Sequence, residues 1–166
     1  FHEGEMLKLA NSINVGPKLL ETSENFLLME LIEGNHFPEW LESLDEKEAQ
    51  SRVCLVLEDV LEQCYRLDEA GLDHGELSTA PKHILVDADD RPYLMDFETA
   101  SINRRVSNVT SACQYLLLGS QIAEKVKQKL GKVDEKQLIQ KLRRYKRERT
   151  RENFEKLVKV IVTKKA

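Results

Sequence analysis

The stretch that decides the fold lies between residues 71 and 98. It reads Gly71-Leu72-Asp73-His74-Gly75-Glu76-Leu77, then Lys82-His83-Ile84-Leu85-Val86, then Tyr93-Leu94-Met95-Asp96-Phe97-Glu98. The apolar runs 84–86 and 93–95 are typical of short strands, and the polar residues 87–90 between them predict a turn. A loop with a His-Gly-acid sequence precedes this hairpin and an Asp-Phe pair follows it, an order that few folds use.

A long helix is predicted immediately before this stretch. Its apolar residues recur at helical spacing up to Gly71, and they are Val53, Val56, Leu57, Val60, Leu61, Cys64 and Leu67. Asp45, with Glu48 three residues later, is typical of a helix start of the capping-box kind. Nearer the N-terminus we predict a short helix over 2–12, strands at 18–21 and 26–32, and a short helix at 37–40.

The C-terminal part of the chain is predicted to be helical. Leu138, Leu142 and Tyr145 form one apolar stripe at helical spacing. A second stripe comprises Phe154, Leu157, Val158 and Ile161, and Thr150 fits the N-cap of the helix that carries it. Together with the short strands predicted above, these helices indicate an α+β fold.

Length and composition predict one globular domain. The chain has 166 residues, of which 41% are hydrophobic and 33% charged, and no apolar run approaches the ~18 residues that a membrane span needs. Three cysteines without CxxC spacing favour a reduced, cytoplasmic protein in which Cys54, Cys64 and Cys113 are small apolar residues on helices. We expect no membrane partner.

The net charge of -4 conceals a strong asymmetry. Residues 1–124 contain 9 basic and 24 acidic side chains, whereas residues 125–166 contain 16 basic and 5 acidic ones. A basic C-terminal region on an acidic body can serve an anionic partner such as RNA, or it can pair with the acidic body itself. Composition leaves both interpretations open.

Between residues 71 and 101 the sequence resembles the C-terminal lobe of the protein-kinase-like superfamily, whose catalytic loop reads His-Arg-Asp or His-Gly-Asp and whose metal motif reads Asp-Phe-Gly or a variant. More narrowly, it is similar to small archaeal predicted Ser/Thr protein kinases related to the RIO and tRNA-modification-complex kinases. The matching motifs are His74-Gly75-Glu76-Leu77-Ser78, Lys82-His83-Ile84 and Asp96-Phe97-Glu98-Thr99-Ala100-Ser101. The resemblance implies a kinase-like fold, with 1–34 as a remnant of the N-terminal lobe and hinge and 35–166 as the C-terminal lobe with basic helices.

The resemblance also implies roles for residues in the three motifs. Asp96 would bind the divalent metal, since its carboxylate is the kind of ligand that Mg2+ prefers. Glu76 matches the catalytic-loop aspartate that orients or deprotonates the acceptor hydroxyl, and His74 would hold the loop by hydrogen bonds. His83 occupies the place of the usual second metal ligand, an asparagine.

Two of these positions depart from the family pattern. Glu76 carries one methylene more than aspartate, and His83 is a poor ligand for Mg2+. Three interpretations follow: Lys82 and His83 contact phosphate directly, Mn2+ suits the site better than Mg2+, or the protein is weakly active or inactive. The cofactors implied are ATP and Mg2+ or Mn2+.

The same resemblance extends to the N-terminal residues. Met29 falls at the gatekeeper position, and the backbone of Glu30 and Ile32 would bond the adenine edge. Glu3 matches the helix glutamate that pairs with a strand lysine. Because no glycine-rich loop or strand lysine precedes Glu3, we expect a chain truncated at its N-terminus and inactive on its own.

Three functions are compatible with these features. The first is an ATP-dependent Ser/Thr protein kinase, or an ATPase switch, with an unknown protein substrate. The second is a pseudokinase-like binding module for RNA or an acidic protein, through basic residues in the segment Arg143–Arg151. The third is a small-molecule kinase, which shares the lobe but needs longer helical insertions than this chain has.

Overall fold

The computed structural model describes residues 2–79 and 81–162. The helices are α1 (His2–Ser12), α2 (Phe37–Glu42), α3 (Glu46–Ala70), α4 (Asn108–Leu117), α5 (Gln121–Leu130), α6 (Glu135–Arg147) and α7 (Arg151–Val162), with the 3-10 helix η1 (Pro81–His83). The strands are β1 (Leu19–Thr22), β2 (Leu27–Met29), β3 (Gly34–His36), β4 (Ile84–Asp87) and β5 (Pro92–Leu94). The predicted α+β class is confirmed.

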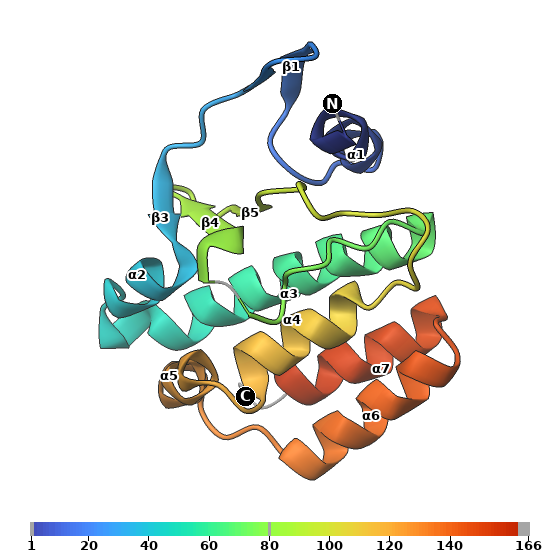
Figure 1. Cartoon of the computed structure of the whole chain (residues 1–166). Coiled ribbons are helices and arrows are strands. Elements are labelled where there is room, and N and C mark those ends of the chain that lie inside the picture. The colour runs from blue at the N-terminus through green and yellow to red at the C-terminus, as the bar shows by residue number, and fades with distance from the viewer. Residues whose placement is uncertain (1, 80, 163–166) are drawn as a thin grey trace.

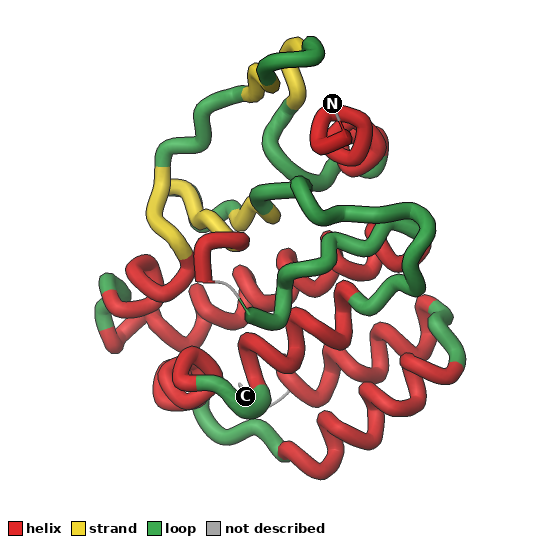
Figure 2. The backbone as a smooth tube through the Cα atoms, in the orientation of Figure 1, coloured by secondary structure: helices red, strands yellow, loops and turns green. Residues whose placement is uncertain are grey.

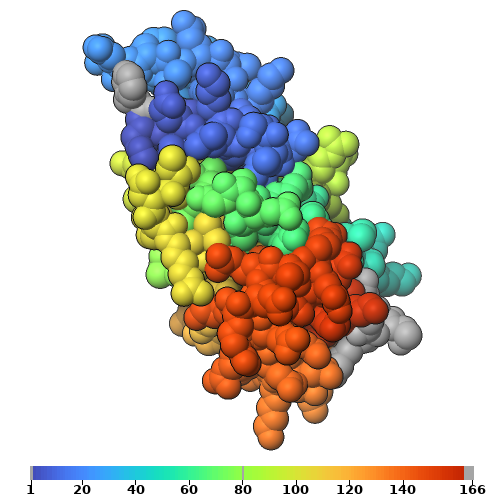
Figure 3. Space-filling model, turned by 90° about the vertical axis from the view of Figure 1, so that its right-hand side faces the viewer, coloured from blue at the N-terminus to red at the C-terminus, as the bar shows by residue number. Residues whose placement is uncertain are grey.

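The elements form a helical body below and a smaller N-terminal part above it (Figure 1). The body consists of α2 to α7, and the N-terminal part consists of α1 and the β1–β2 hairpin, separated from the body by a long loop after β5 (Figure 2). The space-filling view from the side shows the same order, with N-terminal residues at one end and C-terminal helices at the other (Figure 3). The division of the chain at residue 34 into two lobes stays a prediction.

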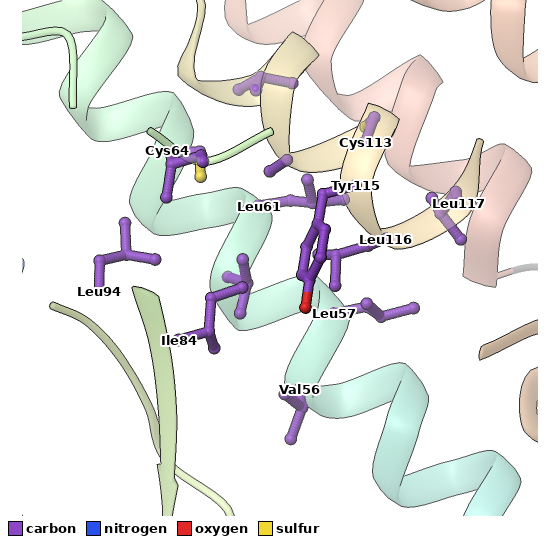
Figure 4. Close-up of a cluster of buried hydrophobic side chains, with 14 of the residues drawn as sticks. Val56, Leu57, Leu61, Cys64, Ile84, Leu94, Cys113, Tyr115, Leu116 and Leu117 are labelled. Carbon is purple, nitrogen blue, oxygen red and sulfur yellow. The ribbon is translucent and has the colours of Figure 1, made fainter. Parts of the chain in front are cut away.

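The centre of the body is α3, a helix of 25 residues that starts and ends where the sequence predicts. Asp45 occupies the N-cap, but its side chain does not make the capping hydrogen bond, and Gly71 ends the helix in a left-handed conformation. Figure 4 shows how leucines of α3 meet side chains from α4, β4 and β5. All three cysteines are buried and outside disulfides, as predicted.

Strand β3 was not predicted from the sequence. Gly34-Asn35-His36 has no strand-like composition, yet it pairs antiparallel with β4, which in turn pairs with β5. A Cβ at Gly34 would collide with the backbone oxygen of Val86, so close approach of the two strands requires glycine. The predicted strand at 26–32 is correspondingly shorter, because only Leu27–Met29 pairs with β1.

The β4–β5 turn is anchored to the helices below it. Asp90 accepts hydrogen bonds from Arg52 Nε and Nη2 at 2.7 and 2.8 Å and from Trp40 Nε1 at 3.0 Å. The hydrogen bonds from Arg52, more than that from Trp40, lower the pKa of Asp90. The hairpin is therefore held at a defined position on α2 and α3.

The C-terminal helices agree with the predicted stripes. Leu138, Leu142 and Tyr145 are buried on α6, and Phe154, Leu157 and Ile161 are buried on α7. Thr150 caps α7, since its hydroxyl accepts a hydrogen bond from Asn153 N at 3.1 Å. None of the described helices is both long and apolar enough to cross a bilayer.

Two leucines of α3 test the assignment of the core. Leu57 is fully buried, whereas Leu55 is 64% exposed on the same helix. We expect Leu57→Ala to lower the free energy of unfolding by about 2–5 kcal/mol, because it leaves a cavity. The control Leu55→Ala should change it by less than about 0.5 kcal/mol. Urea denaturation measures both values, and equal losses would contradict this packing.

Candidate functional site

Two loops that carry the site are joined by backbone pairing. Asp73 N donates to Ser101 O and Ser101 N donates to Asp73 O, both at 2.9 Å. This pair brings the loop after α3, which contains His74 and Glu76, beside the loop after β5, which contains Asp96. The site therefore lies where α3 ends and where the hairpin formed by β4 and β5 ends.

Arg104 forms hydrogen bonds to both loops. Its Nε donates to Asp73 Oδ2 and its Nη2 donates to Thr99 O, each at 2.7 Å. Asp73 Oδ1 accepts a further hydrogen bond from Ser107 N at 2.8 Å. Neither Asp73 nor Arg104 was given a role from the sequence, because they are 31 positions apart in the chain and no local pattern indicates the contact.

A buried polar network supports the same loop from below. Asn108 Oδ1 accepts from His74 N at 2.8 Å, and Asn108 N and Nδ2 both donate to Asp68 Oδ1 at 2.9 Å. Tyr145 OH donates to Asp68 Oδ2 at 2.8 Å. Burial raises the pKa of Asp68, and the hydrogen bonds from Tyr145 and Asn108 oppose that rise.

Sequence reasoning missed this network, although one signal was present. Asp68 follows Leu61 and Cys64 on the apolar stripe of α3, where a carboxylate is costly unless it is hydrogen-bonded. A charged residue at such a position predicts partners of its own. Those partners, on α4 and α6, were not identifiable from the local pattern.

His74 links the loop to the end of β5. Its ring is completely buried; Nε2 donates to Met95 O at 2.8 Å, which leaves Nδ1 to accept from Glu76 N at 3.3 Å. Phe97 packs edge-on against the ring, with centroids 5.0 Å apart. Burial lowers the pKa of His74, so the neutral ring predominates at neutral pH. These contacts suit a residue that holds the loop.

Three of the predicted site residues lie together. Ligand atoms of Glu76, His83 and Asp96 are all within 4.8 Å of one another. His83 Nε2 is 3.7 Å from Glu76 Oε2 and 3.6 Å from Asp96 Oδ2. The imidazole is 6% exposed, whereas the two carboxylate side chains are 36% and 45% exposed. This arrangement, which we call the His83 cluster, can hold a divalent cation.

Asp96 has a strained backbone. Its φ of 64° is left-handed, a region that residues other than glycine adopt at a cost of about 1–3 kcal/mol. Phe97 is buried beside it and holds the loop in place, and Asp96 Oδ1 accepts from Glu98 N at 3.3 Å. Strain of this kind is concentrated at functional sites.

Helix α1 faces this loop. Burial raises the pKa of Glu3, the carboxylates of Asp96 and Glu98 raise it further, and a hydrogen bond from the Phe97 backbone opposes the rise. His2 Nε2 lies 2.7 Å from Ala100 O on the same loop. Glu3 is therefore close enough to Asp96 to interact with its charge.

The remaining predicted residues lie outside the His83 cluster. Met29 ends β2 and packs against the core, and Glu30 N donates to Lys18 O at 2.9 Å. The backbone of Ile32 makes no hydrogen bond to the described residues. Lys82 is exposed in η1, and it forms no ion pair within the described part of the chain.

Comparison with known proteins adds a relative without an assigned activity. The chain is 28% identical over 121 residues to the uncharacterized protein MJ1211 of Methanocaldococcus jannaschii. The aligned region covers 72% of this chain and 99% of that protein. No protein-family model matches the sequence. The function must therefore be argued from the site.

The burial of His74 predicts a pH dependence of stability. Its pKa is lower in the folded protein than the ordinary value of 6.5, so the unfolded chain binds the proton more tightly. The free energy of unfolding should consequently fall as the pH drops below about 6.5, and this contribution should be constant above that pH. Urea titrations between pH 5 and 7.5 measure the slope.

The variant His74→Gln provides the comparison. It removes the titrating ring, so its stability should depend less steeply on pH across this interval, whatever its stability at pH 7.5. Equal slopes for the two proteins would show that the pKa of His74 is not lowered by folding.

Proposed function

We propose that the protein is a kinase-like phosphotransferase that uses ATP and a divalent metal ion. It transfers the terminal phosphate to a Ser/Thr hydroxyl of a protein, or to water in an ATPase switch. The observation that carries this proposal is the His83 cluster, in which the strained Asp96 of the Asp-Phe pair approaches a residue of the His-Gly-Glu loop. The kinase-like fold is part of the proposal.

The residues of the cluster fit a divalent cation. Two donors that share one ion at ~2.1 Å, at angles between 90° and 109°, are ~3.0–3.4 Å apart. His83 Nε2 lies only slightly farther than this from each carboxylate, at 3.6 and 3.7 Å, and both carboxylates are exposed enough to turn. A metal bound here would neutralise charge on the phosphates of ATP.

Glu76 would hold the acceptor hydroxyl. Its backbone is fixed on both sides, because Glu76 N donates to His74 Nδ1 and Glu76 O accepts from His83 Nδ1 at 3.0 Å. Only the side chain is free to swing. A carboxylate must lie within ~2.6–3.2 Å of the hydroxyl whose proton it accepts, and the longer arm of glutamate reaches farther than aspartate would.

The adenine would bind at the segment that follows β2. Glu30 N is already bonded to Lys18 O, which leaves the Glu30 carbonyl and the Ile32 backbone to face a ligand. Glu3 would sit near the phosphates, because its carboxylate is within the electrostatic reach of Asp96. The nucleotide would thus lie between the N-terminal part and the body.

Replacing Asp96 tests the proposal. We expect Asp96→Asn to lower metal-dependent ATP turnover by about 100-fold or more, since it removes a charged ligand. The matched control is Asp89→Asn, because Asp89 is an exposed carboxylate in the β4–β5 turn. ATP binding by calorimetry and phosphate release should be measured on the protein at its full natural length.

The Glu76→Gln variant makes the test more specific. It should lose turnover and keep ATP binding in the absence of metal, because the Glu76 carboxylate is proposed to act on the metal and the acceptor hydroxyl and not on adenine. Unchanged turnover in both Asp96→Asn and Glu76→Gln would reject the phosphotransferase.

A second candidate function, binding of RNA, is favoured by the cations on α6 and just after it that form no ion pair with the described residues. Arg151 forms ion pairs through Nη1 with Glu62 Oε2 at 2.7 Å and through Nε with Glu155 Oε2 at 3.2 Å. Its charge is therefore already paired, in part with Glu62 of the acidic body. The other basic residues of the segment 143–151 form no ion pair within the described residues; they are Arg143, Arg144, Lys146, Arg147 and Arg149. Within the segment 143–151, the internal-pairing interpretation therefore applies to Arg151, whereas elsewhere in the basic region Lys125 also pairs with the acidic body through Glu42.

Four of these cations lie on α6, and Arg149 follows the end of that helix. Arg147 borders two grooves, one lined also by Arg105 and Arg149 and the other by Lys136 and Arg143. Lys136 and Arg147 are ~16 Å apart along the axis at ~1.5 Å per residue. Arginines in such a row suit the repeated phosphates of a nucleic-acid strand, because each guanidinium can bond a phosphate with two N–H groups.

The dependence of affinity on salt tests RNA binding. The double variant Arg143→Ala, Arg147→Ala should weaken binding of single-stranded RNA and make the slope of log K against log salt shallower by about 1.4, at ~0.7 per lost phosphate contact. Lys125→Ala is the matched control, because Lys125 pairs with Glu42. Fluorescence anisotropy gives both quantities. Binding of acidic peptides but not RNA would indicate a protein partner instead.

A further inference from the structure

We propose that the His83 cluster is selective for a first-row transition ion, with Mn2+ as the ion that phosphoryl transfer would use, and that His83 determines this selectivity against Mg2+. The inference concerns the site of the proposed phosphotransferase and adds the identity of its metal. It depends on the geometry of one imidazole.

The hydrogen bonding of His83 sets its tautomer. Nδ1 lies 3.0 Å from the carbonyl oxygen of Glu76, which can only accept, so Nδ1 carries the proton. In the neutral ring, Nε2 then has its lone pair free, and Nε2 lies 3.7 Å from the Glu76 carboxylate and 3.6 Å from that of Asp96. A histidine that donates from one nitrogen to a carbonyl and offers the other to a metal is the usual arrangement of metal-binding histidines.

The ring is held in place before any metal binds. His83 is nine-tenths buried, its carbonyl accepts from Met95 N at 2.9 Å, and its ring packs against His74 with centroids 5.3 Å apart. Met95 immediately precedes Asp96, so this hydrogen bond also fixes the distance between the two ligands. The exposed carboxylates of Glu76 and Asp96 are the groups that can rotate to bind the metal.

A doubly protonated imidazole explains these distances less well. Charge-assisted hydrogen bonds to carboxylates are ~2.7–2.9 Å long, and the single Nε2–H can point at only one acceptor. The observed 3.6 and 3.7 Å are nearly equal and longer than a hydrogen bond. These two distances are compatible with a metal ion that lies between the imidazole and the two carboxylates.

Ligand chemistry then decides the ion. Mg2+ demands oxygen ligands in a near-ideal octahedron and keeps much of its water, whereas imidazole nitrogen suits the transition ions. One nitrogen and two carboxylates therefore favour Mn2+ and its heavier neighbours in the series over Mg2+. An asparagine at position 83 would offer oxygen and remove this preference.

The test is metal binding without nucleotide. In calorimetric titrations with MnCl2 and with MgCl2, we expect the Kd for Mn2+ to be at least ~10-fold lower than that for Mg2+. His83→Asn should raise the Kd for Mn2+ by ~10-fold or more and bring the two ions to similar affinities. His36→Asn is the matched control, because it removes an imidazole from β3, which is not part of the cluster. Circular dichroism verifies that each variant is folded.

Equal affinity of the wild type for Mn2+ and Mg2+, or an unchanged preference in His83→Asn, would overturn the inference. The Mn2+ electron paramagnetic resonance spectrum adds a direct readout, since nitrogen coupling should be present in the wild type and absent in His83→Asn. If Mn2+ binds as expected but ATP is neither bound nor turned over, the metal site stands and the phosphotransferase fails. If ATP turns over equally well with Mg2+ in the wild type and in His83→Asn, the phosphotransferase stands and the proposed selectivity for Mn2+ fails.

Discussion

The buried carboxylate of Asp68 is the interaction on which the candidate site depends. It receives hydrogen bonds from Asn108 at the start of α4 and from Tyr145 on α6, and Asn108 in turn bonds the backbone of His74. A carboxylate inside the core is stable only when such donors surround it. The end of α3, the start of α4 and the loop that carries Glu76 are consequently held in one arrangement.

The site itself combines rigid and adjustable parts. His74 and His83 are buried and bonded through both backbone and ring, whereas the carboxylates of Glu76 and Asp96 reach solvent. Buried rings held in place beside exposed carboxylates can accept a cation with little reorganisation. The left-handed backbone of Asp96 is maintained by buried Phe97, so packing in the core stabilises a strained residue at the surface.

Much of this arrangement was predictable because it depends on local patterns. Helical periodicity located α3, and the alternation of apolar runs and turn residues located β4 and β5 within a residue. The triplet Glu76, His83 and Asp96 was identified through motif resemblance, and the structure brings the three together. Strand β3 was missed because its pairing with β4 overrides a composition that does not favour strands.

The sequence by itself determined the element order, the apolar faces of the helices and the residue types available for chemistry, because each follows from spacing of a few residues along the chain. Only the tertiary structure decided which distant groups meet. Asp68 meets Tyr145 across 77 residues, and His83 turns one nitrogen to Glu76 and the other to Asp96. Such contacts depend on how helices and loops pack in three dimensions, and no local pattern along the chain encodes them.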